Sequence, residues 1–277
     1  MRSLTPSPSV AAPARHLPLP SPSLSLHCSL SSLGSVFAAK LMLKLIKEMD
    51  YVKGGLGWKV WGAALVLSKK LLSLQKSFQD KRVIELGSGC GLCGLLVAKL
   101  GACEVVLTDY EPEILTNLGN NALLLPASVL EPEQLGQSTT KMGSPEVACD
   151  YTYDELASHK RPAIIRVRIL DWAEDASSFL EEKELSYPFW PNLSSDERFD
   201  WVIGSDLIYN HYNIKSLVGV INCRLSKQGG QGLFAAPVRE KEWEACMELL
   251  EVEEGGTLHG VDHYEGGIVI IHVTHKL

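Results

Sequence analysis

A glycine-rich segment over residues 85–91 has the composition of a ligand-binding loop. It reads E-L-G-S-G-C-G, follows the short apolar run at 82–86 and precedes a helical pattern. Glycines let the backbone turn tightly and approach a ligand, and a helix N-terminus presents free N–H groups. Asp109 ends the next apolar run, twenty residues after Gly89. A carboxylate at that place accepts hydrogen bonds from both hydroxyls of a ribose. Together these residues predict a cofactor site.

Two cofactor classes fit this loop. Residues 89–94 match G-x-G-x-x-G, the dinucleotide fingerprint, and Asp109 has the expected spacing. Shifted by two residues, the loop matches E-x-G-x-G-x-G, the form that holds S-adenosylmethionine, with Glu85 just before the first glycine. A sulfonium cofactor carries an ammonium group and no pyrophosphate, so an acid beside the loop favours it over a dinucleotide. A glycine turn that binds no ligand is the remaining alternative.

Cys90 and Cys93 form a C-x-x-C pair inside the same loop. The sequence has no second C-x-x-C and no histidine pair with zinc-ligand spacing, so we expect packing cysteines and no metal. A helix N-terminus lowers the pKa of a nearby thiol, which makes a redox-sensitive cysteine a further hypothesis.

Strand-like and helical patterns alternate along most of the chain. Helices are predicted at 35–51, 58–74, 91–100, 111–125, 176–183, 214–225 and 239–253. Strands are predicted at 82–86, 104–108, 163–170, 199–205, 232–237, 257–264 and 267–275. The alternation predicts an α/β fold with a doubly wound, seven-stranded, mostly parallel sheet and a C-terminal antiparallel hairpin. In such sheets ligands bind at the carboxyl ends of the strands, where the glycine loop and Asp109 would meet.

Composition narrows the class of protein. The 277 residues are 45% hydrophobic and 21% charged, which excludes a fully disordered or collagen-like chain. The net charge of −7 gives no global basic surface for nucleic acid, and no apolar run is long enough to predict a membrane span. Seven cysteines in a chain of this size indicate a reducing compartment.

Two segments depart from the globular pattern. Residues 1–47 hold five bases and no acid, and the first 35 residues hold ten serines and six prolines. We expect a disordered leader there, with the composition of a transit peptide, or alternatively an extension upstream of a start at Met42. Residues 48–277 then form one α/β domain with a net charge of −12, interrupted by a polar insertion at about 126–162.

Several motifs in this order resemble the family-16 seven-β-strand methyltransferases, a group that includes the methyltransferase-like 21 protein-lysine methyltransferases. They are Trp61, the 85–91 loop, Thr108-Asp109, Leu170-Asp171-Trp172 and Asp206-Leu207-Ile208-Tyr209. The resemblance covers about residues 55–250, and its most specific element is the D-x-x-Y motif that ends at Tyr209. It assigns residues 48–277 to a methyltransferase domain and makes the dinucleotide interpretation a minor one.

The resemblance implies a cofactor, a set of site residues and a substrate. The cofactor is S-adenosylmethionine. With Glu85 from the loop motif, the expected cofactor residues are Trp61, Glu85, Gly87, Ser88, Gly89, Asp109, Trp172 and Ser205. The expected acceptor-side residues are Asp206, which would anchor an incoming lysine amine, and Tyr209, which would orient its lone pair. The expected partner is a protein substrate. The protein itself is expected to be a monomer that binds neither nucleic acid nor a membrane.

Some features leave the substrate and the location open. Gly62 stands where relatives carry an acid or proline, and Asn210-His211-Tyr212 replaces a segment in which many relatives have a glutamate. A small-molecule or other non-lysine methyltransferase, and a cofactor-binding module without turnover, are therefore the alternatives. The expected location is the cytoplasm, with a plastid or mitochondrion as the alternative through residues 1–47.

Overall fold

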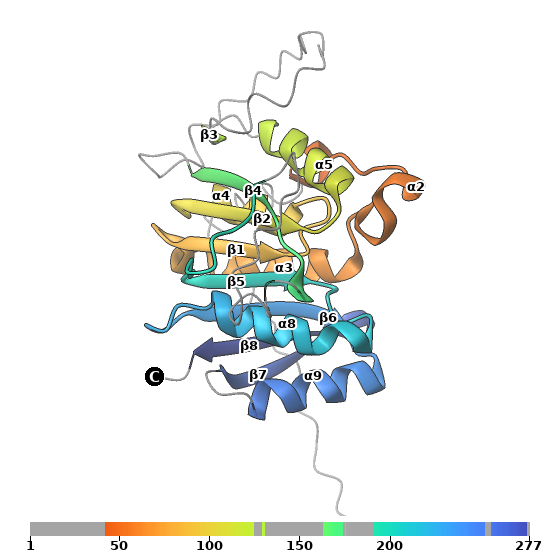
Figure 1. Cartoon of the computed structure of the whole chain (residues 1–277), viewed down its shortest axis with the longest axis vertical. Coiled ribbons are helices and arrows are strands. Elements are labelled where there is room, and N and C mark those ends of the chain that lie inside the picture. The colour runs from red at the N-terminus through yellow and green to blue at the C-terminus, as the bar shows by residue number, and fades with distance from the viewer. Residues whose placement is uncertain are drawn as a thin grey trace, which may run out of the picture.

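An eight-stranded sheet organises the part of the chain that the computed structural model describes, namely residues 42–124, 129–130, 163–173, 175, 191–252 and 256–275 (Figure 1). The strands follow the spatial order β3-β4-β2-β1-β5-β6-β8-β7. Their bounds are β1 (Arg82–Leu86), β2 (Glu104–Asp109), β3 (Val129–Leu130), β4 (Ile164–Ile169), β5 (Trp201–Ser205), β6 (Gln231–Pro237), β7 (Gly256–Tyr264) and β8 (Ile268–His275).

Strand direction follows the doubly wound pattern. The pairs from β3 to β6 are all parallel, while β8 runs antiparallel to β6 and β7 antiparallel to β8. The hairpin turns through η4 (Glu265–Gly267), between the two strands predicted to form it. The predicted α/β fold and all seven predicted strands are therefore confirmed. The eighth strand, the two-residue β3, falls inside the segment expected to be a polar insertion, and most of that segment lies outside the described residues.

Helices cover both faces of the sheet. Their bounds are α2 (Tyr51–Gly54), α3 (Gly62–Ser73), α4 (Leu92–Lys99), α5 (Pro112–Leu123), α8 (His211–Arg224) and α9 (Glu240–Val252), with short 3-10 turns η1 (Gly55–Gly57) and η2 (Gln75–Phe78). Figure 1 shows α8 and α9 in front of the sheet, and α3 and α4 behind it. No helix in these described ranges is long and apolar enough to cross a bilayer.

Alternating side chains divide β1 between two cores. Val83 packs with α3, α4 and α5, whereas Ile84 and Leu86 pack with α8 and α9. This alternation is the period of two that any strand imposes. It places Glu85 on the face that α4 covers, which decides the role of that carboxylate.

The N-terminal end of the described chain packs on the core. Met42 and Ile46 are buried in the core shared with α3 to α5. The backbone N–H of Lys47 donates to Asn121 Oδ1, and the Lys47 carbonyl accepts from Asn117 and Asn121. Residues 42–47, which sequence analysis assigned to the leader, thus belong to the packed region; residues 1–41 lie outside the described part.

Ion pairs join the amino ends of the strands, away from the glycine loop. Arg82 pairs with Glu104 and Glu197, and Arg166 pairs with the same two carboxylates. These contacts tie β1, β2 and β4 to the segment that leads into β5. A cavity lies at the opposite, carboxyl edge of the sheet.

Candidate active site

The turn after β1 uses glycines in left-handed conformations. Gly87, Gly89 and Gly91 have φ angles of 54°, 52° and 83°. Side chains rarely adopt such angles, so the turn requires these residues. A Cβ at Gly87 would also lie 2.8 Å from Leu207 Cδ2 and 3.3 Å from the Trp172 ring, which shows how tightly the loop is enclosed.

Glu85 lies beneath the loop and holds the start of α4. Its carboxylate accepts a hydrogen bond from the Gly94 N–H at 3.0 Å, and the residue is only 2% exposed. A Cβ at Gly94 would meet Glu85 Oε2 at 2.7 Å and Leu107 Cδ2 at 2.3 Å, so only glycine lets the helix approach. Burial raises the pKa of Glu85 to about 8, partly offset by the Gly94 bond.

Asp109 joins the glycine loop to the end of β2. Its Oδ2 accepts from the Gly89 N–H at 3.1 Å, and its Oδ1 accepts from the Tyr110 N–H at 2.9 Å. Burial, at 7% exposure, raises the pKa of this carboxyl to about 6. Each carboxylate oxygen can accept more than one bond, so Asp109 keeps acceptor capacity toward the cavity that it lines.

Ser88 links the same two strand ends through its hydroxyl. The Ser88 Oγ donates to the Glu85 carbonyl at 3.2 Å and accepts from the Thr108 N–H at 3.0 Å. The Ser88 N–H donates to the Thr108 carbonyl at 2.7 Å. The residue lines the cavity as expected, but its side chain is committed to holding the loop in place.

The segment before α3 forms one wall of the cavity. Gly57 passes over the glycine loop, where a Cβ on Gly89 would lie 3.4 Å from the Gly57 carbonyl oxygen. Trp61 is the N-cap residue of α3, and its Nε1–H donates to the Leu56 carbonyl at 2.8 Å. The ammonium of Lys59 lies 4.4 Å from the centre of a Trp61 ring, a cation–π distance.

The D-x-x-Y motif follows β5 at the carboxyl edge. Asp206 has a φ of 57°, a left-handed conformation that aspartate tolerates better than most residues. Its Oδ1 accepts from both Nη atoms of Arg239, each at 3.0 Å. Asn210 caps α8 by accepting from the Tyr212 N–H, so Asp206 is not the helix cap.

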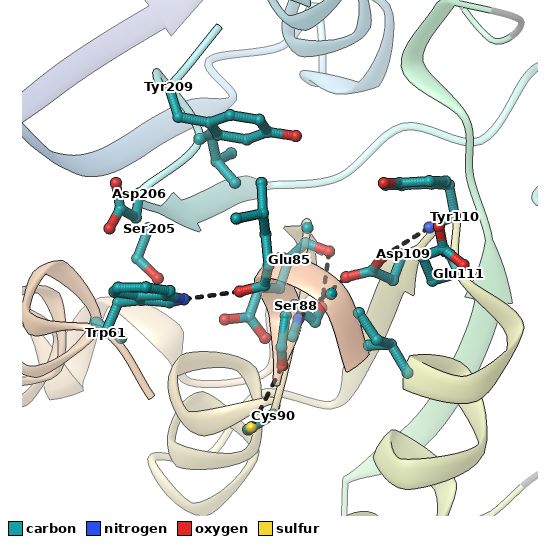
Figure 2. Close-up of a pocket in the computed structure, with 18 of the residues that line it drawn as sticks. Trp61, Glu85, Ser88, Cys90, Asp109, Tyr110, Glu111, Ser205, Asp206 and Tyr209 are labelled. Atoms are coloured by element: carbon teal, nitrogen blue, oxygen red, sulfur yellow. Dashed lines mark hydrogen bonds between the residues drawn. The ribbon is translucent and has the colours of Figure 1, made fainter. Parts of the chain in front are cut away.

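Tyr209 is half-buried in the cavity wall. Burial raises its pKa, a contact with Asn213 opposes this, and the charge of Asp109 adds to it. Figure 2 shows Trp61, Ser205 and Asp206 on one side of the glycine loop, with Asp109, Tyr110 and Glu111 on the other. The cavity therefore has one side that carries Asp109 and another side that carries Asp206.

All ten expected site residues line one cavity of about 670 Å³. Ligand pockets generally have volumes of about 300–1,000 Å³. A buried acid, a glycine loop that lines the cavity and the flanking indoles of Trp61 and Trp172 fit a nucleoside joined to a sulfonium and an ammonium group. The residues present thus fit S-adenosylmethionine.

The cysteines of the loop do not behave as a reactive pair. Cys90 Sγ contacts the Gly57 carbonyl, and Cys93 Sγ contacts Ser68 Oγ. Burial raises the pKa of Cys90 to about 12 and that of Cys93 well above its ordinary value. The hypothesis of a thiol activated by the helix N-terminus is therefore wrong, because desolvation and the nearby acids outweigh the helix. None of the five described cysteines forms a disulfide.

The topology and the carboxyl-edge cavity define the Rossmann-like fold of methyltransferases. A solved Pyrococcus horikoshii protein, described as a candidate RNA methyltransferase, superposes with a TM-score of 0.51 over 87% of this chain and all of its own, at 14% identity. That likeness concerns the fold alone. Residues 40–136 match the model of the lysine methyltransferase family, which confirms the family resemblance indicated by the sequence motifs.

Curated relatives carry lysine methyltransferase names. The EFM7 protein N-terminal and lysine N-methyltransferase of Yarrowia lipolytica is 29% identical over 70% of this chain and 61% of its own. The human protein-lysine N-methyltransferase EEF2KMT is 30% identical over 68% of this chain and 48% of its own. The Danio rerio protein N-lysine methyltransferase METTL21A is 45% identical over 24% of this chain and 30% of its own. The chain thus spans about half the length of the curated relatives that it matches.

Sequence analysis missed both of the basic residues that line the cavity. Lys59 lies two residues before Trp61, and Arg239 follows β6, the strand beside β5. A signal for Arg239 was present, since a charged residue just after a strand of a parallel sheet lies at the ligand-binding edge. Its pairing with Asp206 depends on the order of the strands, which sequence patterns did not supply.

Proposed function

We propose that this chain is an S-adenosylmethionine-dependent protein-lysine N-methyltransferase. The observation that carries the proposal is that one cavity holds the glycine loop and Asp109 on one side and Asp206 and Tyr209 on the other. A donor and an acceptor amine can then meet between the two sides. The match to the lysine methyltransferase family and the names of the relatives support the same conclusion.

The cofactor residues act through position and charge. Asp109 would accept the ribose hydroxyls and Trp172 would pack against the adenine. The ammonium end, once beside Glu85, would favour the ionised form of that acid and lower its raised pKa. S-adenosylmethionine, when bound, supplies a methyl group that an amine takes up by in-line displacement. Such a reaction needs alignment more than acid–base catalysis, and the rigid loop supplies that alignment.

The acceptor side has to deliver a neutral amine. Deprotonating a lysine from its ordinary pKa of about 10.4 at pH 7 costs on the order of 4–5 kcal/mol. Burial in the cavity disfavours the charged form and reduces that cost. Asp206 would anchor the arriving ammonium, and the half-buried Tyr209 would then orient the lone pair of the amine as its proton leaves to water.

The rim of the cavity favours a polypeptide acceptor over a small molecule. Leu56, Trp61 and Tyr110 line the cavity and yet are all exposed, at 56%, 37% and 52%. Exposed apolar groups grouped around a site are typical of surfaces that meet another protein. A small-molecule enzyme would instead enclose its acceptor, so this rim supports a protein substrate.

The proposal is tested with labelled cofactor and a heat-treated cell extract as the pool of acceptors. Wild-type protein should label polypeptides. The Asp206→Asn variant should label them at least about tenfold more slowly, with its affinity for S-adenosylhomocysteine unchanged. Asparagine suits this test because it tolerates the left-handed backbone at residue 206. Asp171→Asn, at another acid of the cavity wall, is the matched control.

Each of the other outcomes would indicate a different function for the protein. Label in small molecules alone would identify a small-molecule methyltransferase. Binding of S-adenosylhomocysteine without any labelling would identify a cofactor-binding module. Full activity in Asp206→Asn would show that another group holds the acceptor.

We also propose that the chain acts as a monomer in the cytoplasm. The proposed acceptor and cofactor residues already form one cavity within a single chain, so the site needs no residue from a second copy. A fluorescent fusion of the whole chain, compared with one that begins at Met42, tests the location. Organelle fluorescence that depends on residues 1–41 would favour the plastid or mitochondrion instead.

A further inference from the structure

Arg239 holds the acceptor-side carboxylate from one direction. Its Nη1 and Nη2 both lie 3.0 Å from Asp206 Oδ1, so neither is directed at Oδ2. The same Nη1 donates to the Ile208 carbonyl at 2.6 Å. One guanidinium therefore joins the first and third residues of the D-x-x-Y motif. Because Arg239 follows β6 while the motif follows β5, the contact crosses between neighbouring strands.

The backbone at Asp206 needs such support. Residue 206 is left-handed, with its N–H bonded to the Ala235 carbonyl at 2.8 Å, and the motif up to Tyr209 has no regular structure. A carboxylate on an irregular loop would otherwise sample several rotamers. Because Arg239 fixes both Asp206 Oδ1 and the Ile208 carbonyl, it also determines where Asp206 Oδ2 points.

The charge of Arg239 also bears on the acceptor. The charged residues that line the cavity are the bases Lys59 and Arg239 and the acids Glu85, Asp109, Glu111, Asp171 and Asp206. A fixed cation beside Asp206 weakens the hold of that carboxylate on a second cation. An acceptor ammonium at Asp206 would then lose its proton more readily than it would beside an unpaired aspartate.

We infer that Arg239 is a positioning residue of the methyl transfer, which orients Asp206 through Oδ1 and leaves Oδ2 to the acceptor amine. The inference rests on the proposed function and adds a residue and an electrostatic role to it. A purely structural ion pair would stabilise the loop without changing how the reaction depends on pH. The two roles are therefore distinguished by a pH profile.

The test compares three variants by their initial rates of polypeptide labelling. Labelled S-adenosylmethionine is saturating, heat-treated extract supplies the acceptors, and the pH runs from about 6.5 to 9.5. Arg239→Gln removes the charge and the contacts, and Arg239→Lys keeps the charge but not the two-pronged contact. Lys241→Gln removes one exposed charge nearby, in α9, and is the control. Affinity for S-adenosylhomocysteine is measured for each by calorimetry.

Arg239→Gln should label about tenfold more slowly at pH 7 and shift the acidic limb of the profile upward by about 0.5–1 unit. We expect only a modest shift of the acidic limb because the Arg239 side chain is 37% exposed, so solvent screens its charge. Arg239→Lys should leave the limb in place and recover part of the rate. Lys241→Gln should match wild type, and affinity for S-adenosylhomocysteine should change less than about threefold in every variant.

Four outcomes would overturn the inference. The first is a wild-type rate in Arg239→Gln, and the second is a slower rate with a profile parallel to wild type. The third is a wild-type labelling rate in Arg239→Lys, which would show that the two-pronged contact is unnecessary. That result decides alone if Arg239→Gln fails to fold. The fourth is a wild-type protein that labels no polypeptide, because the proposed function then fails and this inference falls with it.

Discussion

The Asp109 carboxylate accepts the Gly89 N–H at 3.1 Å, so the glycine loop and the end of β2 are held together before any ligand arrives. The twenty residues that separate Gly89 from Asp109 in the sequence form α4 and then β2, which brings the chain back to the same edge of the sheet. Pre-formed geometry of this kind reduces the ordering cost of binding. Asp109 thus supports the loop and also lines the cavity.

Affinity for S-adenosylhomocysteine should fall as the pH drops through about 6, because Asp109 has its pKa there and ribose hydroxyls donate best to the ionised form. Asp109→Asn should bind about 10- to 100-fold more weakly at pH 8, the loss of a hydrogen bond to a charged group. Calorimetry from pH 5 to 8 measures both. Asp171→Asn should keep wild-type behaviour, and a pH-dependence that persists in Asp109→Asn would assign the titration to another residue.

Glu85→Gln should change how stability depends on pH. The pKa of Glu85 is raised from 4.5 to about 8 in the folded protein. Its contribution to stability is therefore complete below pH 4.5 and is lost as the pH rises through 8, at up to about 1.4 kcal/mol per unit. Urea unfolding of ligand-free protein at pH 5.5, 7 and 8.5 should show the variant gaining on wild type as the pH rises. Parallel curves would contradict the assignment.

Gly94→Ala should destabilise the domain by about 1–3 kcal/mol, the usual cost of overpacking. The new Cβ would meet Leu107, which is fully buried, and the Glu85 carboxylate that caps α4. Gly62→Ala is the control, because a Cβ there meets only Ile268 Cδ1, at 3.7 Å. Urea unfolding should show no loss in the control. Equal effects of the two substitutions would mean that the contact at Gly94 relaxes freely.

Leu56→Ser should reduce polypeptide labelling by about fivefold or more, because an apolar contact at a protein interface contributes on the order of 1 kcal/mol. Its affinity for S-adenosylhomocysteine should change less than about twofold on the same reasoning. Leu123→Ser is the matched control, since Leu123 is 51% exposed against 56% for Leu56 but lies at the far end of α5. A similar loss in both variants would indicate a general effect on stability rather than docking at the rim.

Much of the fold follows from local sequence. The seven predicted strands are present because short apolar runs, bounded by glycine and charged residues, bury both of their faces when helices cover a parallel sheet on both sides. The short β3 was not foreseen, since Val129 and Leu130 alone carry no periodicity. The helical pattern predicted over residues 35–51 is present at 42–45, but placing residues 42–47 in a disordered leader was wrong, because Met42 and Ile46 reach the core.

The sequence by itself determined that the glycine loop, Asp109 and Asp206 would lie together, because residues that end neighbouring parallel strands gather at one edge of the sheet. Tertiary structure decided what each side chain does there. Ser88 and Glu85 bond to neighbouring backbone, while burial and nearby acids raise the pKa of both loop thiols against the influence of the helix. The pairing of Asp206 with Arg239 depends on β5 lying beside β6, a relationship between strands that no local pattern encodes.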